Sequence, residues 1–235
     1  MKKYIGTKQI EAEPMTRGDA WGKHLLREEP STENFDDEGY HVRYEDEYES
    51  WSPKDVFEKA YKVAETPVDR MQIEAEEVNG RYVKLAAFID SGKMDEVVND
   101  MYNKCLLEMQ CCTMFDYIRL LDTRIQRMQG SDSAEVRKMN FGMAIMALKA
   151  GFPIRRSGWN GKGLMVFKQI PAHIESDVIP KMQSLPQSAK DLILKDKGFI
   201  DYTSQCLIYN ENTGRADSWV PSISDVFADD WEIVQ

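Results

Sequence analysis

The sequence lacks any run of about 18 apolar residues, the length that a membrane-spanning helix needs, and so excludes such a helix. Its first residues, Met1–Gly6, run directly into Glu11 and Glu13 and lack the apolar core of a signal peptide. We therefore expect no association with a membrane and a location in the cytoplasm.

Patterns for metal binding and for disulfide bonds are also missing. The three histidines are far apart in the sequence, and no Cys-x-x-Cys pair occurs, so a structural zinc site has no support. Three of the four cysteines fall in one predicted helix, and we expect buried, reduced thiols rather than disulfides. The cysteines are Cys105, Cys111, Cys112 and Cys206.

Catalytic motifs are absent as well. The sequence has no G-x-S-x-G elbow, no H-x-x-E-H helix and no paired cysteine and histidine. Acidic residues are abundant, but none lies among histidines as a metal-dependent phosphodiesterase would require. These absences favour a binding protein that needs no cofactor over an enzyme.

Positive charge is scarce. The 235 residues include 30 basic and 40 acidic ones, which gives a formal net charge of −10. Residues 1–66 hold 16 acidic and 10 basic residues, whereas residues 131–235 hold 13 and 12 and are nearly neutral. A large basic surface for duplex nucleic acid is therefore excluded. The C-terminal part can still form a local cationic pocket for a small anion.

What the sequence does contain predicts an α+β protein, which begins with a small α+β module over residues 1–66. Short alternating runs predict strands over residues 3–10, 40–44 and 48–51. A helix should then begin with Ser52 as its N-cap and Pro53 in its first position.

Residues 67–130 have a different pattern, with apolar residues at every third or fourth position. This spacing is typical of amphipathic helices, and the break at Asp90-Ser91-Gly92-Lys93 divides the segment into a helical hairpin.

Residues 139–235 follow a polar linker and predict a domain of antiparallel strands packed on one helix. Asn140 can cap that helix, and Gly151 can end it. Strands are expected at residues 164–168, 202–209 and 231–234, with a short helix over 188–194 inside an insertion. Asp229 and Asp230 are expected to form a solvated turn.

The stretch from Arg155 to Gly163 (RRSGWNGKG) is the most informative for function. Its three glycines let the backbone approach a ligand closely, and N–H groups beside Arg156 and Lys162 suit phosphate oxygens. Trp159 offers a face for a nucleobase, worth about 1–3 kcal/mol of stacking, and Asn160 can bind a ribose hydroxyl. The structural alternative is a tight turn with Trp159 packed in the core.

A second stretch, residues 219–225, contains Ser222, Ser224 and Asp225. The serines can donate to a ligand, and Asp225 can accept from ribose hydroxyls. The alternative is a capping cluster at the start of a short helix.

Two ordered motifs resemble a known family. Met139-Asn140-Phe141-Gly142, Ala147–Gly151 and Arg155–Gly163 resemble the opening of the second Thoeris anti-defence family, a phage sponge domain. Trp219-x-Pro221-Ser222-x-Ser224-Asp225, followed by Asp230-Trp231, resembles that family's closing motif, and residues 179–186 resemble its longer members.

This resemblance implies a homo-oligomer, expected to be a tetramer, with pockets between protomers. Such pockets capture the cyclic ADP-ribose isomers made by a TIR-domain enzyme of the host, without cleaving them. Cyclic dinucleotides are a second candidate ligand class. Ile223 departs from the polar residue often found at its position in the family. Carried over by position, the ligand-binding residues are Arg156, Trp159, Asn160, Gly161, Lys162, Gln205, Ser222 and Asp225.

The remaining segments add no chemistry. Residues 67–130 resemble a helical domain of gut phages, and residues 1–66 resemble a small phage module of unknown role. Two other functions stay open: a scaffold that binds a protein partner through the acidic front half and the hairpin, and an enzyme that degrades such signals.

Overall fold

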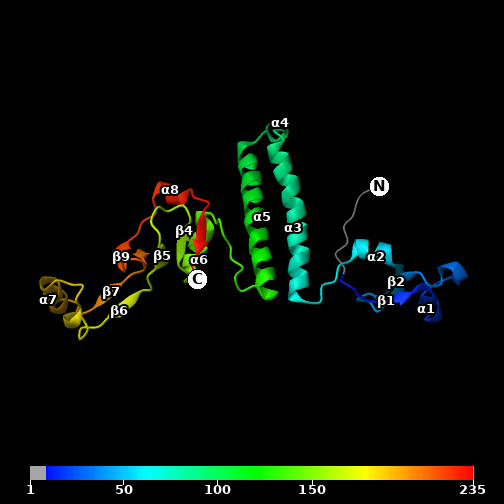
Figure 1. The fold of residues 1–235 in the computed structure, drawn as a ribbon, viewed down its shortest axis with the longest axis horizontal. Helices are drawn as coiled ribbons and strands as arrows, with labels where there is room; N and C mark the ends of the chain where they lie inside the picture. The colour runs from blue at the N-terminus through cyan, green and yellow to red at the C-terminus, as the bar shows by residue number, and fades with distance from the viewer. Residues whose placement is uncertain (1–8, 235) are drawn as a thin grey trace. The chain divides into compact units, whose positions relative to one another are not determined.

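The computed structural model describes residues 9–234 (Figure 1). It divides into two compact units, and the boundary between them falls after Glu74. Helices alternate with antiparallel strands, which confirms the predicted α+β class. The predicted three-domain division stays a prediction. Most of the strand expected over residues 3–10 lies outside the described residues, and the first strand begins at Glu11.

The first unit contains a small antiparallel sheet. Its three strands follow one another in sequence: β1 (Glu11–Thr16), β2 (Glu38–Arg43) and β3 (Glu49–Pro53). Three short helical segments accompany them: α1 (Arg17–Gly22), η1 (Thr32–Asn34) and α2 (Lys54–Ala60). The predicted start of α2 is wrong by one residue, because Pro53 still pairs with Gly39 in the sheet and is itself the N-cap.

The predicted helical hairpin is present. Its elements are α3 (Pro67–Asp90), the single turn α4 (Met94–Val97) and α5 (Met101–Met128). Seven of the less exposed residues of α5 are spaced alternately by three and four: Lys104, Leu107, Cys111, Met114, Ile118, Leu121 and Ile125. This is the spacing of a seam between two packed helices. Within residues 9–234, no helix is both long and apolar enough to cross a membrane.

The predicted burial of the cysteines is wrong. Cys105 and Cys112 are exposed, Cys111 and Cys206 are half-buried, and all four are free. Cys112 follows a seam position by one residue, which rotates it about 100° away from the seam.

The C-terminal part of the second unit is a five-stranded antiparallel sheet covered by one helix. The strands, in the spatial order β10-β4-β5-β8-β9, are β10 (Trp231–Ile233), β4 (Ile154–Arg156), β5 (Leu164–Lys168), β8 (Cys206–Asn210) and β9 (Arg215–Ser218). The helix is α6 (Phe141–Lys149). As predicted, the Asn140 side chain caps it by accepting from Met143 N at 3.0 Å, and Gly151 follows it with φ +91°.

A smaller lobe is inserted between β5 and β8. It consists of the two-stranded sheet of β6 (Ala172–Ile174) and β7 (Ile200–Tyr202), with η2 (Ile179–Lys181) and α7 (Gln187–Lys195) between the strands. The single strand predicted over residues 202–209 is wrong. The chain leaves strand conformation at 203–205 because β7 pairs with β6, whereas β8 pairs with β5.

Three tryptophans gather on the buried face of the large sheet. Trp231 on β10 is fully buried, and the rings of Trp159 and Trp219 contact it edge-on at centroid distances of 5.4 and 6.1 Å. Trp219 follows β9 at the opposite edge of the sheet, and in a flat sheet the two edges would be about 19 Å apart. The segment after β9 therefore folds back across the core and brings α8 (Ile223–Val226) toward β4 and β10.

Candidate functional site

Arg156, at the end of β4, lies between two carboxylates that are each about 70 residues away from it in the sequence. Its Nε donates to Asp230 Oδ1 at 2.7 Å, and its Nη1 donates to Asp225 Oδ1 at 2.9 Å. The register of β4 and β10 pairs Arg156 with Trp231 and so brings the preceding residue, Asp230, beside the guanidinium. The side chain of Arg156 is only 18% exposed, so its charge is paired with carboxylates of the protein itself.

Asp225 is the buried centre of this cluster. Its Oδ1 also accepts from Trp159 Nε1 at 3.1 Å, and its Oδ2 accepts from the backbone N and the Oγ of Ser222 at 3.0 and 2.7 Å. Burial by itself raises the pKa of Asp225. The hydrogen bonds from Ser222, Arg156 and Trp159 outweigh this effect and lower the pKa to about 2. With four donors, the carboxylate has little capacity left to accept from a ligand.

Ser222 and Asp225 form a complete capping box at the start of α8. The Ser222 side chain accepts from Asp225 N at 3.2 Å, and the Asp225 side chain accepts from Ser222 N. The capping alternative weighed from the sequence is therefore confirmed.

The packing alternative for Trp159 is confirmed too, since its ring lies half-buried against the core and contacts Trp231.

The glycines of the turn fit tightly against the protein itself. A Cβ on Gly158 would lie 2.5 Å from Asp230 Oδ2, which already accepts from Gly158 N at 2.8 Å. A Cβ on Gly161 would lie 2.5 Å from Leu164 Cδ1. Gly163 has φ +76°, in the left-handed region that favours glycine. The glycines therefore fix the shape of the turn.

Ser157, Asn160 and Lys162 are the exposed polar side chains of this turn. The backbone around them is anchored on the turn between β8 and β9, because Lys162 O accepts from Asn212 Nδ2 at 2.6 Å and Gly163 O accepts from Glu211 N at 2.8 Å. The turn thus presents one hydroxyl, one amide and one cation to solvent from a fixed backbone.

Within the part of the chain that the structure describes, no hydrogen bond joins the Gln205 side chain to this cluster. It is exposed, and its Nε2 donates to Gln169 Oε1 at 2.7 Å. Since Ile154 pairs with Val166 in antiparallel register, Arg156 lies toward the Leu164 end of β5, whereas Gln169 follows the opposite end.

Two features were missed from the sequence. Asp230 was expected in a solvated turn, but it is half-buried and bound to Arg156, whose hydrogen bond lowers its pKa. The second feature is an apolar patch on and beside α8, in which Val220, Ile223 and Phe227 are 81%, 80% and 81% exposed. Asp230 gave no local sign of its partner, since Arg156 is 74 residues away, and the sequence does not show which apolar residues of this segment stay exposed.

The three charged groups of this cluster nearly neutralise one another. Arg156, Asp225 and Asp230 together carry a net charge of −1, because both carboxylates have lowered pKa values. The cluster includes no histidine or cysteine that could transfer a proton or attack a substrate. Among the described residues, no group of three or more His, Cys, Asp or Glu side chains is placed to hold a metal ion.

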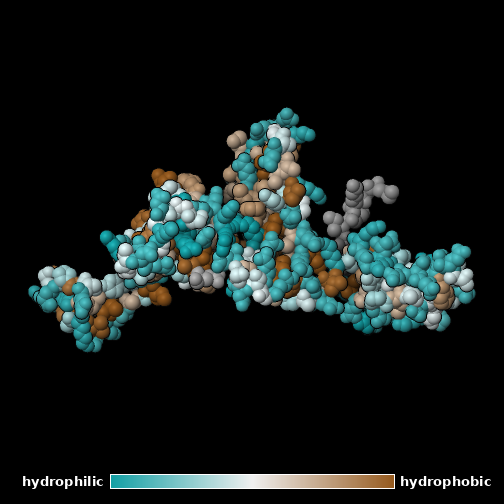
Figure 2. All heavy atoms as spheres, viewed as in Figure 1, coloured by the Kyte–Doolittle hydropathy of each residue, from teal (hydrophilic) through white to brown (hydrophobic). Residues whose placement is uncertain are grey.

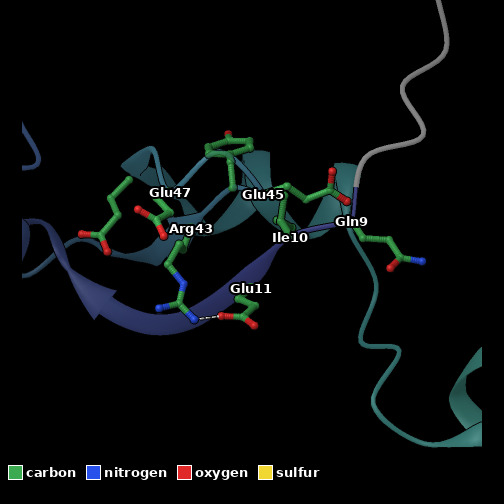
Figure 3. Close-up of a pocket in the computed structure, with 8 residues that line it drawn as sticks. Gln9, Ile10, Glu11, Arg43, Glu45 and Glu47 are labelled. Atoms are coloured by element: carbon green, nitrogen blue, oxygen red, sulfur yellow. Dashed lines mark hydrogen bonds and ion pairs between the residues drawn. The ribbon is translucent and has the colours of Figure 1, made fainter.

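A separate recess of about 760 Å³ lies in the first unit, beside β1 and β2 (Figure 3). Glu11, Glu45, Glu47 and Glu49 line it together with Arg43, which is paired with Glu11. A lining with this excess of carboxylates repels an anionic nucleotide, so this recess is not the predicted site.

Comparison with known proteins places two families along the chain. Residues 139–234 match the family model described as a Thoeris anti-defense 2-like domain, and residues 65–127 match the family model described as Sequestin. The curated protein Thoeris anti-defense 2 of Bacillus phage SP01 is 32% identical over 102 residues, which cover 41% of this chain and 96% of that protein.

Proposed function

The chain belongs to the Thoeris anti-defense 2 family through its residues 139–234, and from this premise we propose that it is a phage anti-Thoeris protein that captures nucleotide immune signals without cleaving them. The proposed ligands are cyclic ADP-ribose isomers, with cyclic dinucleotides as a second class. The match of residues 65–127 to a family whose name denotes sequestration supports the same kind of activity.

The observation that carries this proposal is the fixed turn over residues 157–163. Arg156, Asp230 and the turn after β8 hold its backbone from both sides, while Asn160 and Lys162 remain exposed. A site that is already ordered before binding loses little conformational entropy when the ligand arrives. This suits a protein that must compete for a signal by affinity alone.

The predicted site residues take two different roles in this proposal. Asn160, Gly161 and Lys162 contact the ligand, the amide through ribose or base and the lysine through phosphate. The four residues of the internal network hold them in position: Arg156, Trp159, Ser222 and Asp225.

We further propose a homo-tetramer that closes the pocket between protomers. The exposed patch of Val220, Ile223 and Phe227 lies on and beside the helix that Asp225 caps, and it supplies apolar area for such an interface. Gln205, which precedes β8 and lies beside the far end of β5, would then reach the ligand from a neighbouring copy.

Native mass spectrometry of the full chain with cyclic ADP-ribose isomers and cyclic dinucleotides tests capture directly. We expect an assembly that gains ligand mass and returns the ligand intact after heating. An assembly that gains no mass, or that returns a cleaved product, would refute the proposal.

Matched lysine variants test the site. Lys162→Ala removes a charge-assisted hydrogen bond and should weaken binding by roughly 10- to 100-fold. Lys149→Ala, at an exposed lysine at the end of α6, removes the same charge and should bind like the wild type. Equal affinities for the two variants would place the ligand elsewhere.

A further inference from the structure

α5 carries more apolar surface than a two-helix hairpin can cover. Tyr102 is 70% exposed, Met109 59%, Leu106 42% and Leu120 39%. Figure 2 shows apolar residues at the surface along the hairpin. A helix that is apolar on several sides is typical of the interior of a larger bundle.

The exposed residues form an ordered stripe that is separate from the seam of α5. Tyr102, Leu106, Met109, Thr113 and Leu120 are spaced by three, four or seven residues, so they share one side of the helix. A shallow apolar recess of about 390 Å³ opens on this side. Its lining includes Leu106, Met109, Thr113 and Val78 of α3.

The outward side of α3 is polar, in contrast to that of α5. It carries Glu77, Arg81 and Lys84, all exposed, and Arg81 pairs with Glu77 at 3.5 Å. α3 is thus suited to face solvent, and α5 is suited to the inside of an assembly.

We propose that α5 pairs with α5 of a second copy of this chain, antiparallel and centred on Thr113, to form a four-helix bundle. Two leucines of the stripe lie symmetrically about this residue, because Leu106 and Leu120 are each seven positions from Thr113. Two copies related by a two-fold axis then place Leu106 of one opposite Leu120 of the other. A small residue at the crossing point lets the two helices approach closely.

Charge complementarity favours the antiparallel orientation. The segment that leads into α5 carries Asp95, Glu96 and Asp100, of which Asp95 is paired with Lys104, whereas the last turns of α5 carry Arg124 and Arg127 with one acidic residue, Asp122. Antiparallel pairing brings the acidic end of each helix toward the basic end of the other, and parallel pairing would bring like charges together. The same orientation aligns the two helix dipoles favourably.

Disulfide trapping tests the crossing point. In the full chain with all four native cysteines changed to alanine, Thr113→Cys should give a covalent dimer under mild oxidation. Val83→Cys, at a 54% exposed position of α3, is the matched control and should stay monomeric on a non-reducing gel. If Thr113→Cys forms dimer no faster than Val83→Cys, the proposed pairing is wrong.

Light scattering tests the surface by a second route. The double variant Leu106→Glu, Met109→Glu should halve the mass of the assembly, whereas Val83→Glu should leave it unchanged. Both changed residues of the double variant are exposed within one chain, and circular dichroism would verify that its helices persist. An unchanged mass in the double variant would place all contacts between copies in the C-terminal domain. That result would overturn the α5 proposal while leaving the proposed function intact.

Discussion

Replacement of Asp225 by asparagine should destabilise the C-terminal domain more than any exposed charge change. Asparagine keeps the shape of the side chain but removes the charge that Arg156 and Trp159 contact at 2.9 and 3.1 Å. The pKa of Asp225 is lowered from 3.8 to about 2. At about 1.4 kcal/mol per pKa unit, the ionised carboxylate contributes about 2 kcal/mol to the free energy of unfolding.

The sign of the effect fixes its pH dependence. The folded pKa of Asp225 lies below the unfolded one, so its contribution is fully present above roughly pH 5 and is lost as the pH falls toward 2. The wild type and Asp225→Asn should therefore differ by about 2 kcal/mol at pH 7, and the difference should shrink in acid. Other carboxylates titrate in the same range, but they are common to both proteins and cancel.

Fluorine NMR of 5-fluorotryptophan, recorded during a urea titration, would measure the unfolding of the C-terminal domain separately from that of the rest of the chain. Trp159, Trp219 and Trp231 report on the large sheet. Asp217→Asn is the matched control, since it removes the same charge from a side chain that is 52% exposed and paired with Arg215. Exposed pairs contribute about 0–1 kcal/mol. If the two variants unfolded at the same urea concentration, Asp225 would not be the centre of the network.

Two further changes probe the turn and the indole. Gly158→Ala places a Cβ 2.5 Å from Asp230 Oδ2 and should lower the free energy of unfolding by about 1–3 kcal/mol, measured by thermal melting. Gly80→Ala is the control: its Cβ would enter open space on a helix, and it should raise the free energy of unfolding by about 0.5–1 kcal/mol. Trp159→Phe keeps an aromatic ring against Trp231 but removes the N–H that donates to Asp225. It should therefore lower the free energy of unfolding in urea by about 1–3 kcal/mol. An unchanged urea midpoint would contradict the hydrogen bond.

Local sequence signals predicted the elements that local physics controls. The apolar spacing of the hairpin, the Asn140 cap and the Gly151 stop all depend on neighbours within a few residues, and each was confirmed. The strand expected over 202–209 failed because its two halves pair with different strands. A local sequence pattern indicates that a segment is extended, but it does not show whether the whole segment pairs with one strand or its two halves pair with different strands.

The internal network of the site could not be derived in the same way. Arg156 and Asp230 are 74 residues apart, and they meet only because β4 and β10 are paired in one particular register. The sequence indicated the right residue types at Arg156, Trp159 and Asp225, but it could not indicate that they contact each other. Residues chosen as ligand contacts therefore turned out to be one another's partners.

This pairing of Arg156 with Asp225 and Asp230 determines where the phosphates of the proposed ligand would bind. Arg156 is already paired with two ionised carboxylates, and the three groups together are negative. A phosphate next to them would be repelled unless it displaced Asp225 or Asp230, at the cost of leaving a carboxylate buried and unpaired. Lys162 is exposed three residues after Trp159, and no carboxylate among residues 9–234 forms an ion pair with it. The phosphates should therefore lie toward Lys162, and the ribose or base toward Asn160. Ligand titrations of Lys162→Ala and Asn160→Ala at low and high salt test this orientation. Only the lysine contact should weaken with salt, so the affinity lost in Lys162→Ala should shrink at high salt, whereas the loss in Asn160→Ala should not change.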